Sequence, residues 1–178
     1  MGYLSDKDQT HVASLPALTE LTDEIFAPYG KVIHHKGLGK RHYFETDFSE
    51  EVAGAHVKTW VSRIMAPLRR DETLTCMERH PHTDQMFAPL SGQRFLVMVC
   101  DDRDGQPAPD TLRAFCAPSG TGVLFHRNVW HAGMRTFDAP AEFIVTMKTG
   151  LPDDDVFATL ETPIPLAPYV DDMTIEVL

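Results

Sequence analysis

Residues 111–131 read TLRAFCAPSGTGVLFHRNVWH and alternate between short apolar runs and turn-forming residues. The runs 111–117 and 123–126 favour strands, and the Pro- and Gly-containing stretch 118–122 between them favours a turn. Arg127-Asn128 is a turn dipeptide that leads directly into Val129-Trp130-His131. Closely spaced strands with so little room for a helix indicate an all-β domain.

Further strand-like runs lie on both sides of this stretch. They span 31–33, 57–64, 74–78, 86–90, 94–100 and 142–148. We predict that 86–90 and 94–100 form a hairpin around Ser91-Gly92, and that 22–27 form a short helix with Thr22 as N-cap. Six or more short strands favour a β-sandwich or a barrel, and periodicity alone leaves that choice open.

A chain of 178 residues is expected to form one domain. We expect an N-terminal arm over 1–18, a domain over 19–150, and a tail over 151–178 that packs on the barrel or on a dimer partner. That tail has three consecutive acids at 153–155 and contains several prolines. The first residues have no apolar core typical of a signal peptide, and no run is long enough to span a membrane, so we expect a cytoplasmic protein.

The net charge of −10, from 16 basic and 26 acidic residues, argues against nucleic acid and anionic membrane as partners. A small anionic substrate would therefore need a local basic cluster. The three cysteines form no CxxC pair and have no histidine at a motif-like spacing, so we do not expect a catalytic thiol.

Two histidine-bearing segments, 78–85 (ERHPHTDQ) and 126–131 (HRNVWH), carry the candidate chemistry. His80 and His82 are two residues apart, so in extended backbone they would face the same side. Pro81 between them places the pair at a strand end or sheet edge. The turn at Arg127-Asn128 would direct His131 back toward the same pocket. We therefore predict that the two segments meet at one site.

As a metal centre, three ligands drawn from His80, His82, Gln85 and His131 would suit a divalent transition ion such as Ni, Zn, Mn or Fe. Proton-transfer histidines are the competing interpretation of the same residues. We expect no organic cofactor.

The chain resembles the ureidoglycolate lyase family, also called ureidoglycolate hydrolase. The resemblance rests on 21–30 (LTDEIFAPYG), 78–81 (ERHP), 85–90 (QMFAPL) with Gly92, 112–115 (LRAF), 122–123 (GV) and 125–131 (FHRNVWH). It covers about residues 20 to 150, and its HRNVWH string is specific.

The resemblance implies a cupin-like double-stranded β-helix (jelly-roll) barrel, a homodimer, and a carbon–nitrogen lyase of the amidine-lyase type. Such an enzyme cleaves (S)-ureidoglycolate to glyoxylate and urea in allantoin and purine nitrogen catabolism. His80-Pro81-His82 and Gln85 resemble the first cupin motif, with Gln85 where cupins usually carry glutamate, and His131 resembles the histidine of the second. His82 is a departure, because the family typically has a single histidine before the glutamine.

For this reaction the chain offers several catalytic candidates. We expect His131 or His80 to act as base, directly or through a metal, and His126 or Glu78 to protonate the leaving urea. Arg79 or Arg127 would bind the substrate carboxylate, with Gln85 also in contact. Lys148 would add positive potential.

Two alternatives stay open from the sequence. One is another metal-dependent cupin enzyme, such as a dioxygenase or sugar isomerase, acting on a small hydroxy or ureido acid. The other is a non-catalytic cupin that binds a small acid. The first predicts loss of activity with a chelator and no urea from ureidoglycolate, and the second predicts ligand affinity without turnover.

Overall fold

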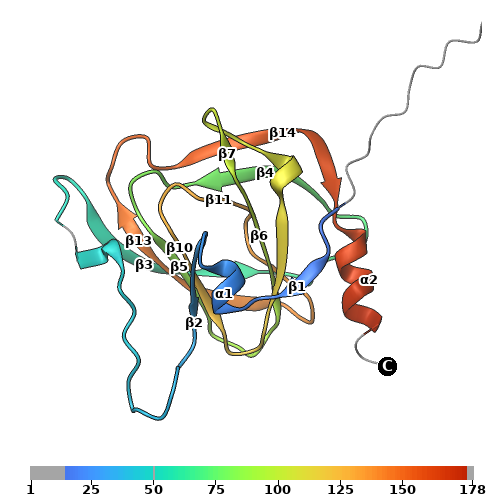
Figure 1. Cartoon of the computed structure of the whole chain (residues 1–178), viewed down its shortest axis with the longest axis horizontal. Coiled ribbons are helices and arrows are strands. Elements are labelled where there is room, and N and C mark those ends of the chain that lie inside the picture. The colour runs from blue at the N-terminus through green and yellow to red at the C-terminus, as the bar shows by residue number, and fades with distance from the viewer. Residues whose placement is uncertain (1–14, 50, 176–178) are drawn as a thin grey trace, which may run out of the picture.

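Two β-sheets face each other in the computed structural model, which describes residues 15–49 and 51–175 (Figure 1). Residues 1–14, which include His11 and most of the predicted arm (1–18), lie outside the described residues, as do 176–178 of the predicted tail. The larger sheet has the order β1 (Leu18–Glu20), β9 (Arg113–Ala117), β6 (Phe95–Cys100), β11 (Trp130–His131), β4 (Thr73–Arg79) and β14 (Val156–Pro165), with β12 (Arg135–Thr136) also on β6.

The smaller sheet has the order β2 (Gly30–Ile33), β10 (Gly122–Phe125), β5 (Gln85–Pro89), β13 (Ala141–Thr149) and β3 (His56–Ile64). A separate hairpin follows β6 and consists of β7 (Asp102–Arg103) and β8 (Gln106–Pro107). The helices are α1 (Asp23–Phe26) and α2 (Ala167–Ile175), and the 3-10 turns are η1 (Asp47–Ser49) and η2 (Pro109–Thr111). The prediction of an all-β, cupin-like barrel with a short N-terminal helix is confirmed.

The apolar core lies between the sheets, where alternate residues of each strand point inward. Val97 and Val99 of β6 pack there with rings from both sheets, among them Phe87, Phe115 and Phe125. A second apolar cluster covers the outer face of the larger sheet, where Leu96, Met98 and Trp130 pack with Leu166 and Tyr169. Because β6 and β11 are buried along their whole length, their sequences are less alternating than those of an ordinary half-exposed strand.

The helix over 22–27 is confirmed in its position and its cap. Thr22 has the extended backbone of an N-cap residue (φ −124°, ψ 160°), and its side chain accepts from the Ile25 N–H. Phe26 is fully buried and its ring makes edge contacts with Phe115 and Phe125. The short helix therefore closes one side of the core.

The predicted hairpin of 86–90 with 94–100 is wrong. β5 belongs to the smaller sheet, where it pairs with β10 and β13, whereas β6 belongs to the larger sheet, where it pairs with β9, β11 and β12. The turn at Ser91-Gly92 thus carries the chain from one sheet to the other. A turn pattern reports that the chain reverses, but the pairing partners depend on which strands bury their apolar faces together.

The larger sheet continues beyond residue 150, the boundary drawn from sequence. β14 pairs antiparallel with β4, with Val156 opposite Arg79 and Phe157 opposite Glu78. α2 follows β14 and lies beside the larger sheet (Figure 1). No helix among residues 15–49 and 51–175 is long and apolar enough to cross a membrane.

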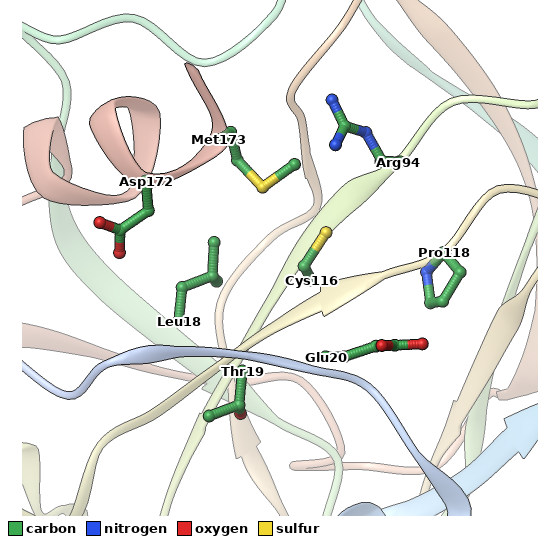
Figure 2. Close-up of a pocket in the computed structure, with 8 residues that line it drawn as sticks. All are labelled: Leu18, Thr19, Glu20, Arg94, Cys116, Pro118, Asp172 and Met173. Atoms are coloured by element: carbon green, nitrogen blue, oxygen red, sulfur yellow. The ribbon is translucent and has the colours of Figure 1, made fainter. Parts of the chain in front are cut away.

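A groove of about 430 Å³ separates α2 from the β1–β9 edge (Figure 2). Its lining residues are Leu18, Thr19, Glu20, Arg94, Cys116, Pro118, Asp172 and Met173. None of them is a histidine, so this groove does not contain the site expected from the sequence.

We expect Phe26→Ala to lower the free energy of unfolding by about 3–5 kcal/mol, because it removes a fully buried ring and leaves a cavity. Ile25→Ala is the matched control in the same helix, since Ile25 is 41% exposed, and it should cost well under half as much. Urea denaturation followed by tryptophan fluorescence measures both. Equal losses in the two variants would contradict the packing described for α1.

Candidate functional site

The site is built on a cross-strand pair. Glu78 of β4 lies directly opposite His131 of β11, and Glu78 Oε1 is 3.5 Å from His131 Nε2. His80 follows Glu78 by two residues and lies on the same side, with 5.6 Å between the His80 and His131 ring centroids. One potential ligand atom from each of the three residues lies within 4.8 Å of the others. The structure thus brings the two histidine segments together, and we call Glu78, His80 and His131 the triad.

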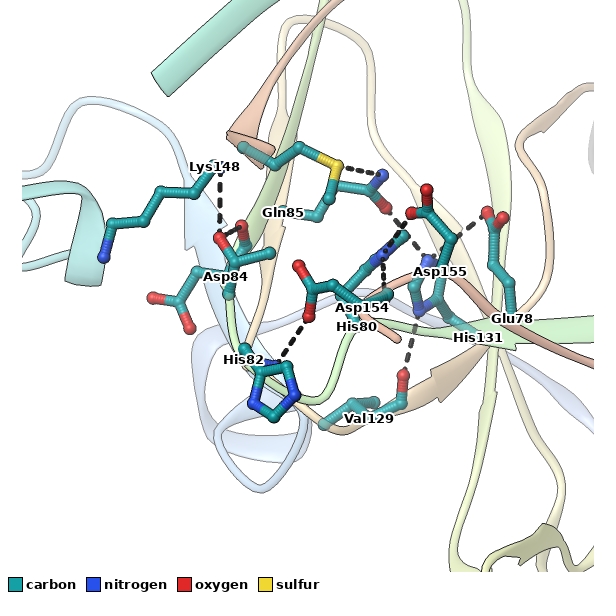
Figure 3. Close-up of polar contacts among 12 residues, drawn as sticks. Glu78, His80, His82, Asp84, Gln85, Val129, His131, Lys148, Asp154 and Asp155 are labelled. Atoms are coloured by element: carbon teal, nitrogen blue, oxygen red, sulfur yellow. Dashed lines mark hydrogen bonds and ion pairs between the residues drawn. The ribbon is translucent and has the colours of Figure 1, made fainter. Parts of the chain in front are cut away.

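His80 is held by backbone rather than by another side chain of the triad. Its Nδ1 lies 3.0 Å from the Asp154 carbonyl, so Nδ1 carries the proton and donates it. The Nε2 lone pair is then left for another partner, and Nε2 is buried without a hydrogen bond. Figure 3 shows Asp154 and Asp155 beside this ring, with Asp155 Oδ1 3.2 Å from Nδ1.

His131 is almost completely buried and stacks on Phe125, with 4.2 Å between ring centroids. Its Nδ1 lies 2.9 Å from the Val129 carbonyl, and its Nε2 lies 3.0 Å from Gln85 Oε1. With acceptors at both ring nitrogens, the arrangement suits an imidazolium that donates twice. Rotating the Gln85 amide would instead suit a neutral ring with an Nε2 lone pair.

The carboxyl group of Glu78 is held in its charged form. Burial by itself would raise the pKa of Glu78, but the hydrogen bond and positive charge of His131 hold this pKa below its ordinary value, and a proton taken up by His80 would lower it further. Glu78 is therefore a carboxylate at neutral pH. It is suited to bind a cation or accept a proton and is poorly suited to donate one.

The two histidine loops are joined by hydrogen bonds from the backbone N–H groups of Arg127 and Asn128. The Asn128 N–H donates to the His80 carbonyl at 2.7 Å, and the Arg127 N–H donates to Asp84 Oδ1 at 3.0 Å. Asp84 also exchanges two hydrogen bonds with Asp47, one from each backbone N–H to the other's carboxylate. Asn128 has a positive φ of 67°, which asparagine tolerates better than most residues.

Two predicted substrate-binding cations lie elsewhere. Arg79 sits between Glu78 and His80, so strand alternation sends its side chain to the outer face, where it stacks on Trp130 and pairs with Asp102. Lys148 follows Met147, whose sulfur contacts Gln85, so the Lys148 side chain points out of the smaller sheet. There it is buried near Asp47, with Nζ 3.9 Å from Asp47 Oδ1. Neither cation is brought to the triad.

The bend at Pro81 separates His82 from His80. The expectation that both face one side assumed extended backbone, whereas residues 81–82 form a bend and His82 is exposed. Its backbone N–H donates to Asp154 Oδ1 at 2.7 Å. His126 is also outside the triad, because it follows the inward-facing Phe125; its Nδ1 lies 3.9 Å from Asp84 Oδ1.

Arg127 lines an open cleft beside His80. The cleft has a volume of about 490 Å³ and is lined by Val52, Pro81, His82, Arg127, Leu151 and Pro152. Three of the chain segments that form it also hold His80: Pro81 follows it, Arg127 precedes Asn128, and Pro152 is close in sequence to Asp154. Of the three basic residues predicted to act on the substrate, Arg127 is the one that lines a cleft together with Pro81, the residue that follows His80.

Sequence reasoning missed Asp84, Asp154 and Asp155 as parts of the site. Asp84 lay inside the histidine segment, but its side chain had no role assigned. The run Asp153-Asp154-Asp155 was visible as an acidic cluster and was interpreted as part of a tail. Its proximity to His80 arises because β14 pairs with β4, which brings the chain back past the end of that strand.

A metal would be held by a donor set that differs in part from the predicted one. His80 and His131 are retained, Glu78 enters, His82 is excluded by distance, and Gln85 contacts His131. Two imidazoles with a carboxylate are a common set for divalent transition ions. Backbone acceptors on both Nδ1 atoms are the usual outer contacts of metal-binding histidines. The triad therefore fits such an ion, and the unpartnered Nε2 of His80 supports that fit.

Comparison with known proteins identifies a family. A model of the ureidoglycolate lyase family matches residues 15–164. A ureidoglycolate lyase of Brucella anthropi is 33% identical over 152 residues, which cover 81% of this chain and 88% of that protein. One of Mesorhizobium japonicum is 33% identical over 138 residues, covering 73% and 83%. Among solved structures, a dTDP sugar isomerase from Desulfovibrio desulfuricans G20 covers 80% of this chain and 86% of its own, with 18% identity and a TM-score of 0.43.

We expect the protein to bind one equivalent of Ni²⁺ or Zn²⁺ and His131→Ala to weaken that binding by at least about 100-fold, because it removes one of three clustered donors. His82→Ala is the matched control: it removes an exposed imidazole outside the triad and should leave affinity within about twofold. Titration against a competing chelator measures both. Equal losses in the two variants would place the metal away from the triad.

Proposed function

This chain belongs to the ureidoglycolate lyase family, and on that premise we propose that it cleaves (S)-ureidoglycolate to glyoxylate and urea. The reaction is a carbon–nitrogen cleavage of the amidine-lyase type within purine nitrogen catabolism. The observation that carries the proposal within the structure is the triad, in which an unpartnered imidazole nitrogen lies beside a second imidazole and a carboxylate. The homodimer and the cytoplasmic location stay predictions.

The substrate requires two proton transfers. One carbon of ureidoglycolate bears a hydroxyl, a carboxylate and a urea nitrogen. Removal of the hydroxyl proton lets the oxygen form the carbonyl of glyoxylate while the carbon–nitrogen bond breaks. The departing nitrogen takes up a proton to give urea. The site must therefore provide a base and an acid on either side of this carbon.

His80 is suited to be the base. The Asp154 carbonyl fixes its proton on Nδ1, so the Nε2 lone pair is available to receive the hydroxyl proton. Asp155, whose carboxylate is largely exposed and lies 3.2 Å from Nδ1, stabilises the imidazolium that results. This is the role that an acidic neighbour plays for a histidine base.

His131 is suited to be the acid. As an imidazolium between Gln85 and Glu78 it holds a proton on Nε2, which it can give to the leaving nitrogen. Glu78 stays ionised and balances its charge, so we assign to His131 the acid role that the sequence offered to His126 or Glu78. Proton return from His80 to His131 restores the starting state.

Arg127 is proposed to bind the substrate carboxylate. The cleft that it lines also includes Pro81, the residue after His80, and a guanidinium there can form a charge-assisted hydrogen bond with a carboxylate. The nearby carboxylates of Glu78, Asp154 and Asp155 would repel an anion, so a cation at this position is required for binding.

A divalent transition metal held by Glu78, His80 and His131 would supply Lewis acidity that lowers the pKa of the substrate hydroxyl. In that case His80 and His131 serve as ligands, and Arg127 retains its role toward the carboxylate. Chelator treatment distinguishes the two arrangements.

We expect purified protein to release urea and glyoxylate from racemic ureidoglycolate, with half of the racemate consumed. His80→Gln and His131→Gln should each lower kcat by about 10²–10⁴-fold, the usual contribution of a positioned acid or base. His56→Gln, at an edge-strand histidine, is the matched control. Loss of release with chelator, restored by a metal, assigns the triad as ligands. Urea release at no more than the spontaneous rate, with and without added metal, would rule out the lyase.

We expect Arg127→Gln to raise KM for ureidoglycolate by at least about tenfold with a smaller change in kcat, because it removes a charged hydrogen bond to a non-reacting group. Arg103→Gln is the control, since Arg103 is exposed and pairs with Asp110 on the β7–β8 side. Initial rates over a range of substrate concentrations measure both constants. An unchanged KM would remove Arg127 from the carboxylate site.

A further inference from the structure

A second cluster lies on the outer face of the larger sheet, behind the triad. The Arg79 guanidinium stacks over the Trp130 ring, 4.6 Å from its centroid, and Arg79 Nη1 pairs with Asp102 Oδ2. The Trp130 Nε1–H donates to the same oxygen at 2.9 Å. One carboxylate oxygen therefore ties β4 to β11.

Asp102 is itself fixed by the hairpin that carries it. Its Oδ1 accepts from the Gly105 N–H at 3.0 Å, and Gly105 has a positive φ of 81° that makes the tight turn between β7 and β8. The Gly105 carbonyl also accepts a long hydrogen bond from Arg79 at 3.5 Å. Burial by itself would raise the pKa of Asp102, but the Trp130 and Gly105 hydrogen bonds and the Arg79 charge hold it below its ordinary value. The hairpin thus presents a fixed anion to both strands.

The outer cluster and the triad share the same strands. Arg79 lies between Glu78 and His80, and Trp130 directly precedes His131. Because side chains alternate, a contact that fixes Arg79 and Trp130 outside also fixes the backbone from which the triad projects inside. β11 has two residues, and one register pair, His131 with Glu78, joins it to β4. The Asn128–His80 backbone hydrogen bond adds one further link, so the distance of β11 from β4 depends on side-chain contacts more than that of a longer strand would.

We propose that Asp102 is a positioning residue: by binding Arg79 and Trp130 together, it sets the spacing of Glu78 and His80 from His131. It touches neither substrate nor triad and acts through the two strands. The inference deepens the proposed function, because it identifies what holds that site's proton carriers or ligands in place.

We call the contact among Asp102, Arg79 and Trp130 the clamp, and two variants test the proposal by removing different parts of it. Asp102→Asn removes the charge that pairs with Arg79. Because Asn has nearly the shape of Asp, this is the variant expected to fold. Trp130→Phe keeps a smaller buried ring for the guanidinium and removes the Nε1–H donor together with part of the indole, so its melting temperature is measured beside its ring signals. Asp138→Asn is the matched control: Asp138 forms a comparable two-point ion pair with Arg94, at the opposite end of β6 from the triad.

The deciding measurement is side-chain ¹⁵N NMR of His80 and His131 in metal-free protein, assigned through the His80→Gln and His131→Gln variants. We expect Asp102→Asn and Trp130→Phe to move both ring signals and Asp138→Asn to leave them unchanged. In the lyase assay, we expect both clamp variants to lower kcat about tenfold and to leave KM within about twofold of the wild-type value. A tenfold loss is the lower end of the range found when a group that orients ligands indirectly is removed.

Wild-type ring signals in both clamp variants, with only a lower melting temperature like that of the control, would overturn the proposal. This readout needs neither metal nor substrate. If the protein released no urea, the proposed function would be wrong, but the ring signals would still test the clamp. If the protein is active and both clamp variants keep the wild-type kcat, the positioning role of Asp102 is overturned as well.

Discussion

The hydrogen bond from the Asn128 N–H to the His80 carbonyl, at 2.7 Å, is the contact on which the site depends. It joins two loops that are remote in sequence, and each loop leads from or into a strand that carries part of the triad. Asp84 strengthens the junction, because its carboxylate accepts backbone N–H groups from Arg127 and from Asp47. Backbone groups that are buried must find partners, so this arrangement fixes the loops without using the side chains needed for chemistry.

Acidic groups shape the electrostatics of this site. Glu78 lies within the triad, and Asp154 and Asp155 approach His80 from the segment before β14. In a chain of net charge −10 they favour cationic species inside, whether an imidazolium or a metal ion. The same field opposes a carboxylate substrate. In the proposed function, the exposed Arg127 supplies the opposing attraction locally at the cleft.

The larger sheet separates chemistry from support by strand alternation. Glu78, His80 and His131 face the space between the sheets, while Arg79 and Trp130 face outward from the same strands. The interior can then hold polar groups that are costly to bury, because the outer face provides compensating packing and an ion pair. This division explains why Arg79 and His80, which are neighbours in sequence, face opposite sides of the sheet and serve different purposes.

The sequence by itself determined the all-β class, the helix capped by Thr22, most strand positions, the family, and the pair His80 and His131. These follow from local patterns of turns and apolar residues and from a specific motif. The tertiary structure decided that β5 and β6 belong to different sheets, that Arg79 and Lys148 face away, and that Asp154 and Asp155 lie beside His80. Local pattern cannot supply these facts, because the partner of a strand and the face of a side chain are set by which apolar surfaces pack together, often between residues far apart in the chain.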